Sequence, residues 1–182
     1  MTEILPLINY GHDHYGENKV QEAVEKWSEI KSDFKSIKLH MIGKLQTNKV
    51  KYVVPLFDYI HSLDNLKLAE KLSNEQLKIN KKLKIFIQVN IGNENQKNGI
   101  STERVEDFYN ICNKDLGLNI VGLMCLPPID SNTKVYFAKM QKLKKQINLS
   151  ELSMGMSDDY LKAIKYDATY LRIGSKIFGS RS

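Results

Sequence analysis

The stretch 85-IFIQVNI-91 decides the fold class, together with a second stretch, 120-IVGLMCL-126. Both runs consist mostly of apolar and β-branched residues and are too short for a typical helix. Strands with this composition are covered on both faces, as in a parallel sheet packed against helices. The two stretches therefore predict buried parallel strands.

Five more short runs predict strands, near residues 12–15, 39–42, 59–63, 151–154 and 170–173. Longer stretches between the runs repeat apolar residues with the 3.6-residue period of a helix, as in Val20, Ala23, Val24, Trp27 and Ile30. Strands that alternate with amphipathic helices indicate βαβ units and an α/β protein. Seven such strands fit a (β/α)8 TIM-type barrel that lacks one strand.

The beginning of the chain indicates which strand is missing. Residues 1–10 predict a helix that ends at Gly11, a residue suited to the C-terminal cap. No strand precedes this helix, so it corresponds to helix 1 of a barrel without strand 1. An open doubly wound sheet is the alternative, but no G-x-G-x-x-G motif follows the first strand.

Composition narrows the class of protein. The chain has 182 residues, 42% of them hydrophobic and 26% charged, which suits one domain over residues 1–182. No apolar run reaches the roughly 18 residues of a membrane helix, and the first residues lack a basic signal-peptide region. We therefore expect a cytoplasmic protein without a membrane partner. The spacing of Cys112 and Cys125 does not fit a zinc site. We expect both side chains to be buried in the apolar core.

The net charge of +6 raises the question of nucleic-acid binding. Only three of the 27 basic residues are arginines, and the lysines are spread along the helical stretches. This pattern indicates a solvated lysine-rich exterior, and we expect no nucleic-acid partner.

Two C-terminal segments carry the strongest functional signal, 152-LSMGMSDD-159 and 171-LRIGSKIFG-179. Each predicts a strand that runs into a turn of small residues, and the turns after the last two barrel strands often bind phosphate. Backbone N–H groups at glycines and serine hydroxyls supply the donors. The candidates are Ser153, Gly155, Ser157, Gly174 and Ser175. Alternatively, the glycines only form turns and Ser157 only caps the helix that follows it.

Arg172 alternates with Leu171 and Ile173 and is therefore predicted to point into the barrel mouth. A guanidinium there needs an acceptor, either a buried carboxylate or a ligand atom beside the phosphate. Glu17 and Asn18 follow the first predicted strand, where they either line the same rim or cap the next helix.

Several segments in this order resemble the pyridoxal-phosphate homeostasis family (YggS-type), relatives of the fold-type III, alanine-racemase-like proteins. They are YGENKVQEA (15–23), LHMIGKLQTNKVK (39–51), HSLD (61–64), FIQVNIGNENQKNGI (86–100), GLMCLP (122–127), LSMGMSDDYLKAI (152–164) and RIGSKIFGSR (172–181). The resemblance implies a barrel that holds pyridoxal 5′-phosphate without established catalytic turnover. It also implies that Ser153, Gly174 and Ser175 hold the phosphate, that Arg172 faces the pyridine nitrogen, and that Asn18 lies near the ring.

One family feature has no counterpart here. The family binds the cofactor through a lysine on the first strand, in a segment similar to AVSKT, and nothing in this sequence matches that segment. We therefore expect an N-terminally incomplete copy of a longer protein, with two open sheet edges and marginal stability. The alternatives are a racemase-class enzyme and a degenerate barrel that binds phosphate compounds non-covalently. We expect a monomer or, at most, a weak dimer.

Overall fold

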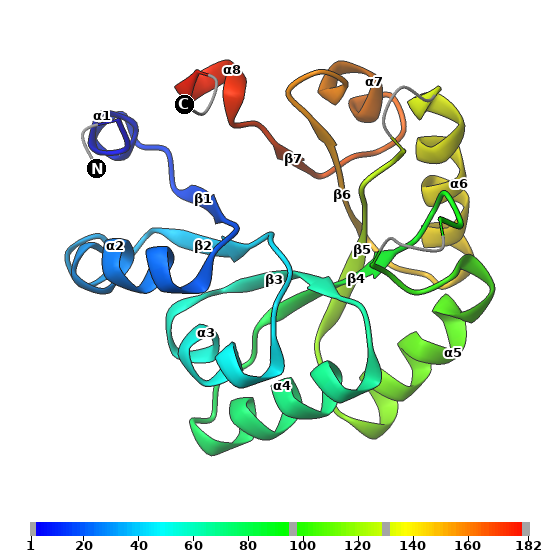
Figure 1. Cartoon of the computed structure of the whole chain (residues 1–182), viewed down its shortest axis with the longest axis horizontal. Coiled ribbons are helices and arrows are strands. Elements are labelled where there is room, and N and C mark those ends of the chain that lie inside the picture. Colours follow the sequence, from blue (N-terminus) through cyan, green and yellow to red (C-terminus); the bar gives the residue numbers. More distant parts are fainter. Residues whose placement is uncertain (1–2, 95–97, 129–131, 180–182) are drawn as a thin grey trace.

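The computed structural model describes residues 3–94, 98–128 and 132–179. Within these ranges the strands form one parallel sheet of seven strands, in which each strand lies beside its neighbour in the chain (Figure 1). The seven predicted strands are all present. Their bounds are β1 (His14–Glu17), β2 (Lys38–Met41), β3 (Tyr59–Leu63), β4 (Lys84–Val89), β5 (Ile120–Cys125), β6 (Glu151–Met156) and β7 (Tyr170–Arg172).

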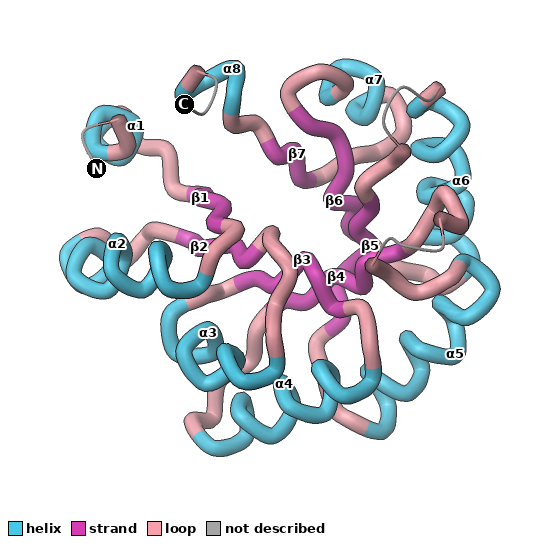
Figure 2. Tube along the Cα trace, in the orientation of Figure 1, coloured by secondary structure: helices cyan, strands magenta, loops and turns pink. Residues whose placement is uncertain are grey.

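Helices follow the strands and surround the sheet on its outer side (Figure 2). The longer ones are amphipathic, and their apolar side faces the strands, as the 3.6-residue period predicts. The helices are α1 (Leu5–Asn9), α2 (Val20–Asp33), η1 (Thr47–Lys49), α3 (Val50–Leu56), α4 (Leu66–Lys78), η2 (Thr102–Arg104), α5 (Val105–Asn110), the π-helical η3 (Ile111–Asp115), α6 (Thr133–Gln146), α7 (Tyr160–Ile164) and α8 (Ser175–Phe178).

The sheet curls into a barrel that lacks one strand, as predicted. Among the described strands, β1 pairs only with β2, and β7 pairs only with β6. These two strands lie on either side of the open part of the barrel, where α1 and α8 also lie (Figure 1). The predicted first helix is present as α1, and Gly11 beyond it has the positive φ of 96° that a helix end favours. Residues 1 and 2 of the prediction lie outside the described residues.

Two groups of apolar side chains form the core. The larger group fills the layer between sheet and helices and includes the fully buried Trp27, Leu123 and Phe137. A smaller group, Tyr59, Phe86 and Met124, lies apart from it, with Tyr170 packed against it. Because side chains of a strand point to opposite faces in turn, the smaller group lies inside the barrel.

The cysteines are both buried and free, as their sequence context predicts. Burial raises the pKa of the Cys112 thiol and of the Cys125 thiol to about 12, so neither is a reactive thiolate at neutral pH.

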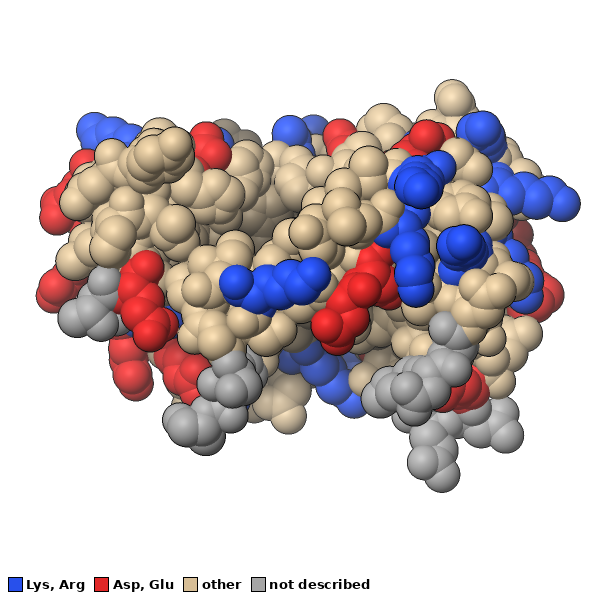
Figure 3. Space-filling view, turned by 90° about the horizontal axis from the view of Figure 1, so that it is seen from above, with Lys and Arg blue, Asp and Glu red and all other residues tan. Residues whose placement is uncertain are grey.

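On the face seen in Figure 3, lysine and arginine side chains lie between aspartates and glutamates. Among the described helices, none combines the length and the apolar character needed to cross a membrane.

Candidate functional site

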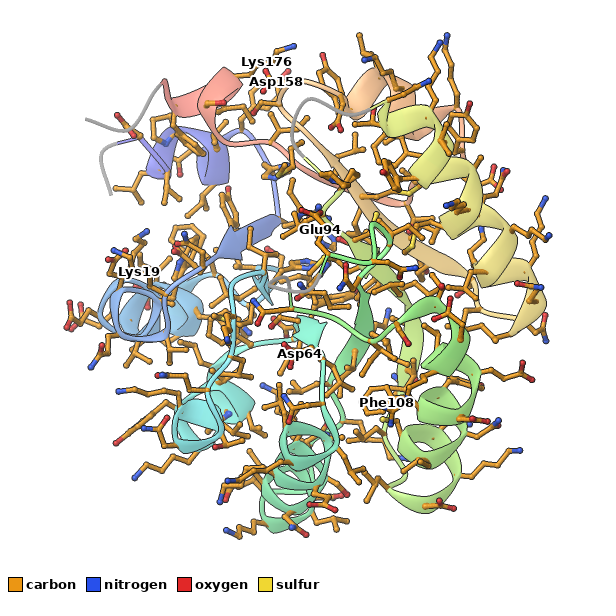
Figure 4. The ribbon with its side chains drawn as sticks, turned by 45° about the vertical axis from the view of Figure 1, so that its right-hand side comes forward. Lys19, Asp64, Glu94, Phe108, Asp158 and Lys176 are labelled. Atoms are coloured by element: carbon orange, nitrogen blue, oxygen red, sulfur yellow. The ribbon has the colours of Figure 1, made fainter. Side chains whose placement is uncertain are left out.

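The turns after β6 and β7 lie at the same end of the barrel. The two strands are parallel and in a register that pairs Met156 with Arg172, the last residue of each. Ser157 therefore follows one strand, and Gly174 and Ser175 follow the other. Lys176 Nζ lies 4.9 Å from the centre of the Tyr160 ring, which brings α8 close to the start of α7. Asp158 and Lys176 mark these two turns in Figure 4.

Gly155 makes the sharp turn at the end of β6 possible. Its φ is +90°, and a Cβ atom there would lie 2.6 Å from Cβ of Ala163. Only glycine combines this backbone conformation with such close packing of strand and helix. Gly155 is thus a structural residue of the turn.

Gly174 differs from Gly155 because packing does not require it. A Cβ atom at Gly174 would have no heavy atom within 4 Å among the neighbours that the structure describes. The backbone therefore borders open space, and Ser175 beside it is exposed. Open space beside backbone N–H groups is what close approach of an anion needs.

Ser157 is buried, but it does not cap a helix. The alternative prediction, that Ser157 only caps the helix that follows it, is therefore wrong. Helix α7 begins three residues later, at Tyr160, and Asp159 occupies the cap position without a side-chain capping bond. Asp159 Oδ1 instead accepts a hydrogen bond of 2.7 Å from the backbone N–H of Met156. This bond closes a turn over residues 156–159 and delays the helix.

Arg172 reaches across the neighbouring strands. One of its terminal nitrogens donates to Ser153 Oγ at 2.8 Å, and the other donates to the backbone carbonyl of Cys125 at 2.9 Å. Burial lowers the pKa of Arg172 from its ordinary value. Among the described residues no carboxylate forms an ion pair with it. The guanidinium is thus held in place by two hydrogen bonds, and Asp159 acts on its charge only from beyond ion-pair distance.

Ser153 lies deeper than the turns. It is the third residue of β6, it is fully buried, and its register partner is Tyr170 at the beginning of β7. Its hydroxyl contacts Arg172 and, at 2.8 Å, the Nδ1 atom of His61. The structure thus brings Ser153 together with Arg172 inside the barrel, whereas Ser157, Gly174 and Ser175 lie at the turns.

A chain of histidines inside the barrel is the feature that sequence reasoning missed. His14 Nδ1 lies 2.8 Å from His40 Nε2, and His40 Nδ1 lies 2.9 Å from His61 Nε2. Burial, with His14 as a lesser cause, lowers the pKa of His40 to about 3, and burial also lowers the pKa of His61 far below its usual value. Both imidazoles are therefore neutral at physiological pH. The signal was present as one histidine in each of three consecutive strands.

Asn18 and Glu17 have different surroundings, although they are adjacent. Asn18 is half-buried, and a Cβ atom at Gly43 would lie 2.1 Å from its backbone oxygen, so the loop after β2 fits closely against it. Glu17 is buried, and its Oε1 atom accepts hydrogen bonds of 2.7 Å from Lys26 Nζ and from Trp27 Nε1. Both interpretations of Glu17, as a rim residue and as a helix cap, are wrong, because it links β1 to α2.

A cavity of about 440 Å³ lies between the two edges of the sheet. Its lining residues are His14 of β1 and Glu151, Thr169, Tyr170 and Leu171 at the beginning of β6 and β7. The cavity is therefore at the opposite end of these strands from the small-residue turns. It borders the position that the missing strand would occupy.

Comparison with known proteins places the chain in a family. The model of the alanine racemase N-terminal domain matches residues 1–182. The pyridoxal phosphate homeostasis protein of Aquifex aeolicus is 37% identical over 187 residues, which cover 98% of this chain and 81% of the relative. That of Haemophilus influenzae is 38% identical and covers 100% and 81%.

Solved structures agree with this assignment. PipY of Synechococcus elongatus PCC7942 without PLP has a TM-score of 0.89 and 33% identity, covering 98% of this chain and 87% of PipY. PipY with PLP bound gives 0.87 and 32% over the same shares. The alanine racemase of Clostridium difficile 630, at 12% identity and a TM-score of 0.74, shows the fold alone and covers 96% of this chain and 47% of its own. The chain therefore belongs to the pyridoxal phosphate homeostasis protein family.

Proposed function

We propose that the chain binds pyridoxal 5′-phosphate at the carboxyl ends of β6 and β7 and acts in homeostasis of this cofactor. The observation that carries the proposal is Arg172, a half-buried cation that two hydrogen bonds hold and that forms no ion pair with a described carboxylate. Such a charge is costly without an acceptor. An aromatic nitrogen beside a phosphate group supplies one. The relatives named pyridoxal phosphate homeostasis protein and the PipY structure with PLP bound support the same ligand.

The residues present fit this cofactor. Ser157, Gly174 and Ser175 would hold the phosphate, because they offer backbone N–H groups and hydroxyls next to open space. Ser153 would contribute indirectly, because its hydroxyl accepts a hydrogen bond from the Arg172 guanidinium and so holds it in place. Asn18 would lie near the ring. Bound pyridoxal phosphate supplies an aldehyde that reacts with amines and a ring that withdraws electrons. Arg172 would keep the ring nitrogen unprotonated, which weakens this withdrawal.

The phosphate-binding part of the proposal can be tested with Gly174→Val. Because a side chain at this position meets no described neighbour, the variant should fold normally, but its side chain would block the approach of an anion to the backbone. Titration by calorimetry should show binding of pyridoxal phosphate by the parent chain and a clear loss in the variant. Pyridoxal, which lacks the phosphate, serves as the control ligand and should bind weakly to both. Equal binding of the two ligands by the parent chain would refute the phosphate site.

The proposal includes the absence of catalytic turnover. Relatives are named for homeostasis rather than for a reaction. Incubation with pyridoxal phosphate and L-alanine should therefore yield no D-alanine, and racemisation would overturn this part. Borohydride reduction followed by mass spectrometry tells covalent from non-covalent binding. Cytoplasmic location and a monomeric state also remain proposals, which fractionation and light scattering test.

A further inference from the structure

The three histidines form one continuous hydrogen-bonded chain between the open edge of the barrel and Ser153. The contacts from His14 to His40, from His40 to His61 and from His61 to Ser153 are 2.8, 2.9 and 2.8 Å long. Of the three, only His14 reaches solvent, since 38% of its side chain is exposed, whereas His40 and His61 are buried. The chain thus has one end at the surface and one inside the barrel.

Aromatic side chains stack on the two buried imidazole rings and fix the orientation of each ring. The His40 ring stacks on Tyr59 with 4.1 Å between ring centres and 13° between planes, and the His61 ring stacks on Phe86 at 4.3 Å and 19°. Stacked rings cannot tilt freely, so their nitrogens stay directed at their neighbours. What can change is which nitrogen of each ring carries the hydrogen.

The Ser153 hydroxyl decides this. Arg172 can only donate, so Ser153 Oγ accepts from it. Ser153 is fully buried, and among the described residues the one acceptor within reach of its hydrogen is His61 Nδ1. His61 must then carry its hydrogen on Nε2 and donate to His40 Nδ1, and His40 must in turn donate from Nε2 to His14 Nδ1. All three hydrogen bonds are thus donated in the same direction, from Ser153 in the interior toward His14 at the surface.

We propose that His14, His40 and His61 form a directed proton relay that sets the orientation of the Ser153 hydroxyl, and that they thereby act as positioning residues for the Ser153–Arg172 pair. This role differs from ligand contact, because none of the three needs to touch the cofactor. Its consequence for the cofactor rests on the proposed function, but the relay itself does not.

Uptake of one proton by the three histidines and Ser153 together reverses every hydrogen bond between them. His14 then carries hydrogen on both nitrogens and donates from Nδ1 to His40 Nε2. In this change the Nε2 hydrogen of His40 passes to His14 Nδ1, that of His61 passes to His40 Nδ1, and that of the Ser153 hydroxyl passes to His61 Nδ1, while the added proton restores the hydroxyl. Both buried rings stay neutral, and the gain is one proton in total. Ser153 Oγ now accepts from both His61 and Arg172, and its own hydrogen becomes free for another acceptor. A bound anion would supply that acceptor.

Other polar groups surround His14 and enter the balance of charge at its end of the chain. Asp13 Oδ1 lies 3.8 Å from His14 Nε2, and the Tyr59 and Tyr170 rings lie 6.1 and 6.0 Å from its ring. The titratable groups near it on each element are His12 and Asp13 beside it, Lys38 and His40 of β2, Tyr59 of β3, Lys84 of β4, which contacts Tyr59, Glu151 of β6 and Tyr170 of β7.

Nitrogen-15 NMR of histidine-labelled protein reads the tautomers directly, without any ligand. At about pH 8, His40 and His61 should both carry hydrogen on Nε2, and after acidification to about pH 5 both should carry it on Nδ1 and remain neutral. His14→Gln offers an acceptor oxygen to His40 but takes up no proton. Its buried histidines should stay in the Nε2–H form at both pH values.

His12→Gln is the matched control, since His12 is exposed and is not one of the three hydrogen-bonded histidines. In this variant the tautomers of His40 and His61 should change with pH as they do in the parent protein. Unchanged tautomers in the parent chain, or a switch that persists in His14→Gln, would overturn the relay. The link to the cofactor has its own test. The affinity for pyridoxal phosphate should depend less on pH in His14→Gln than in the parent, and equal pH dependence would overturn the link while leaving the NMR result intact.

Discussion

The middle of the sheet and its two edges are built from different kinds of residue. In β4 and β5, the strands that share the longest register, all side chains are buried except Lys84 and the half-buried Val121. In β7, by contrast, all three residues are only half-buried, and β1 alternates between buried and more exposed positions. The middle therefore supplies apolar stability, while the edges carry the residues with chemistry, such as Arg172 and His14.

Acidification should have the largest effect on the free energy of unfolding. The pKa of His40 is about 3 and that of His61 is also lowered, so the unfolded state binds more protons below the unfolded pKa of about 6.5. The contribution of His40 to stability is complete above that pH and is lost as the pH falls toward about 3, at about 1.4 kcal/mol per pH unit, and His61 adds a loss in the same direction. Urea unfolding at several pH values measures this slope. His61→Gln should make it shallower, and an equal slope in that variant would contradict the assignment.

A matched pair of leucines tests the comparison most simply. Leu123 of β5 is fully buried, whereas Leu171 of β7 is half-buried. Leu123→Ala should lower the free energy of unfolding by about 3 kcal/mol, because it removes buried apolar surface and leaves a cavity. Leu171→Ala should cost only about 1 kcal/mol, since part of its surface is already in water. Urea titration of both variants decides the point, and equal losses would show that the edge is packed as tightly as the middle.

Glu17 tests how firmly the β1 edge is attached to its helix. Glu17→Ala leaves the buried Trp27 N–H without its acceptor and Lys26 without its ion pair, so we expect a loss of about 1–3 kcal/mol. Glu17→Gln keeps an oxygen for Trp27 and should lose less. If the two variants proved equally stable in thermal unfolding, the hydrogen bond to Trp27 would not matter.

Arg172→Met should have the smallest effect on the fold and a specific effect on the site. The side chain is part of an edge strand, and its two hydrogen bonds go to the Ser153 hydroxyl and the Cys125 backbone carbonyl. The melting temperature should change little, while the absorbance spectrum or the affinity of bound pyridoxal phosphate changes. A parent-like spectrum and affinity would argue against the proposed contact with the ring nitrogen.

The fold could be predicted from the sequence because two periodicities, that of apolar strands and that of amphipathic helices, are local. Tyr59–Leu63 begins and ends at the predicted residues, and β1 and β4 are shifted by two residues or fewer at each end. The turn before α7 was not predictable in this way. Ser157 and Asp159 are both good capping residues, and the hydrogen bond from Met156 to Asp159, which depends on the turn itself, decided between them.

The site was predictable where neighbours in the sequence are also neighbours in space. The turns after β6 and β7 and the inward direction of Arg172 belong to this class. The histidine chain does not, because His61 and Ser153 are 92 residues apart and meet only when the barrel curls. Glu17 was misinterpreted for the same reason, since its partner Trp27 belongs to the next helix.

The place of Trp27 makes the protein its own optical probe. It is the only tryptophan in the sequence, it is fully buried under the β1 edge, and it lies 4.9 Å from the Tyr15 ring. Its emission reports on this edge alone, whereas circular dichroism averages over all helices. If the edge of the barrel opens before the middle unfolds, the tryptophan signal will change at lower urea concentration than the helical signal.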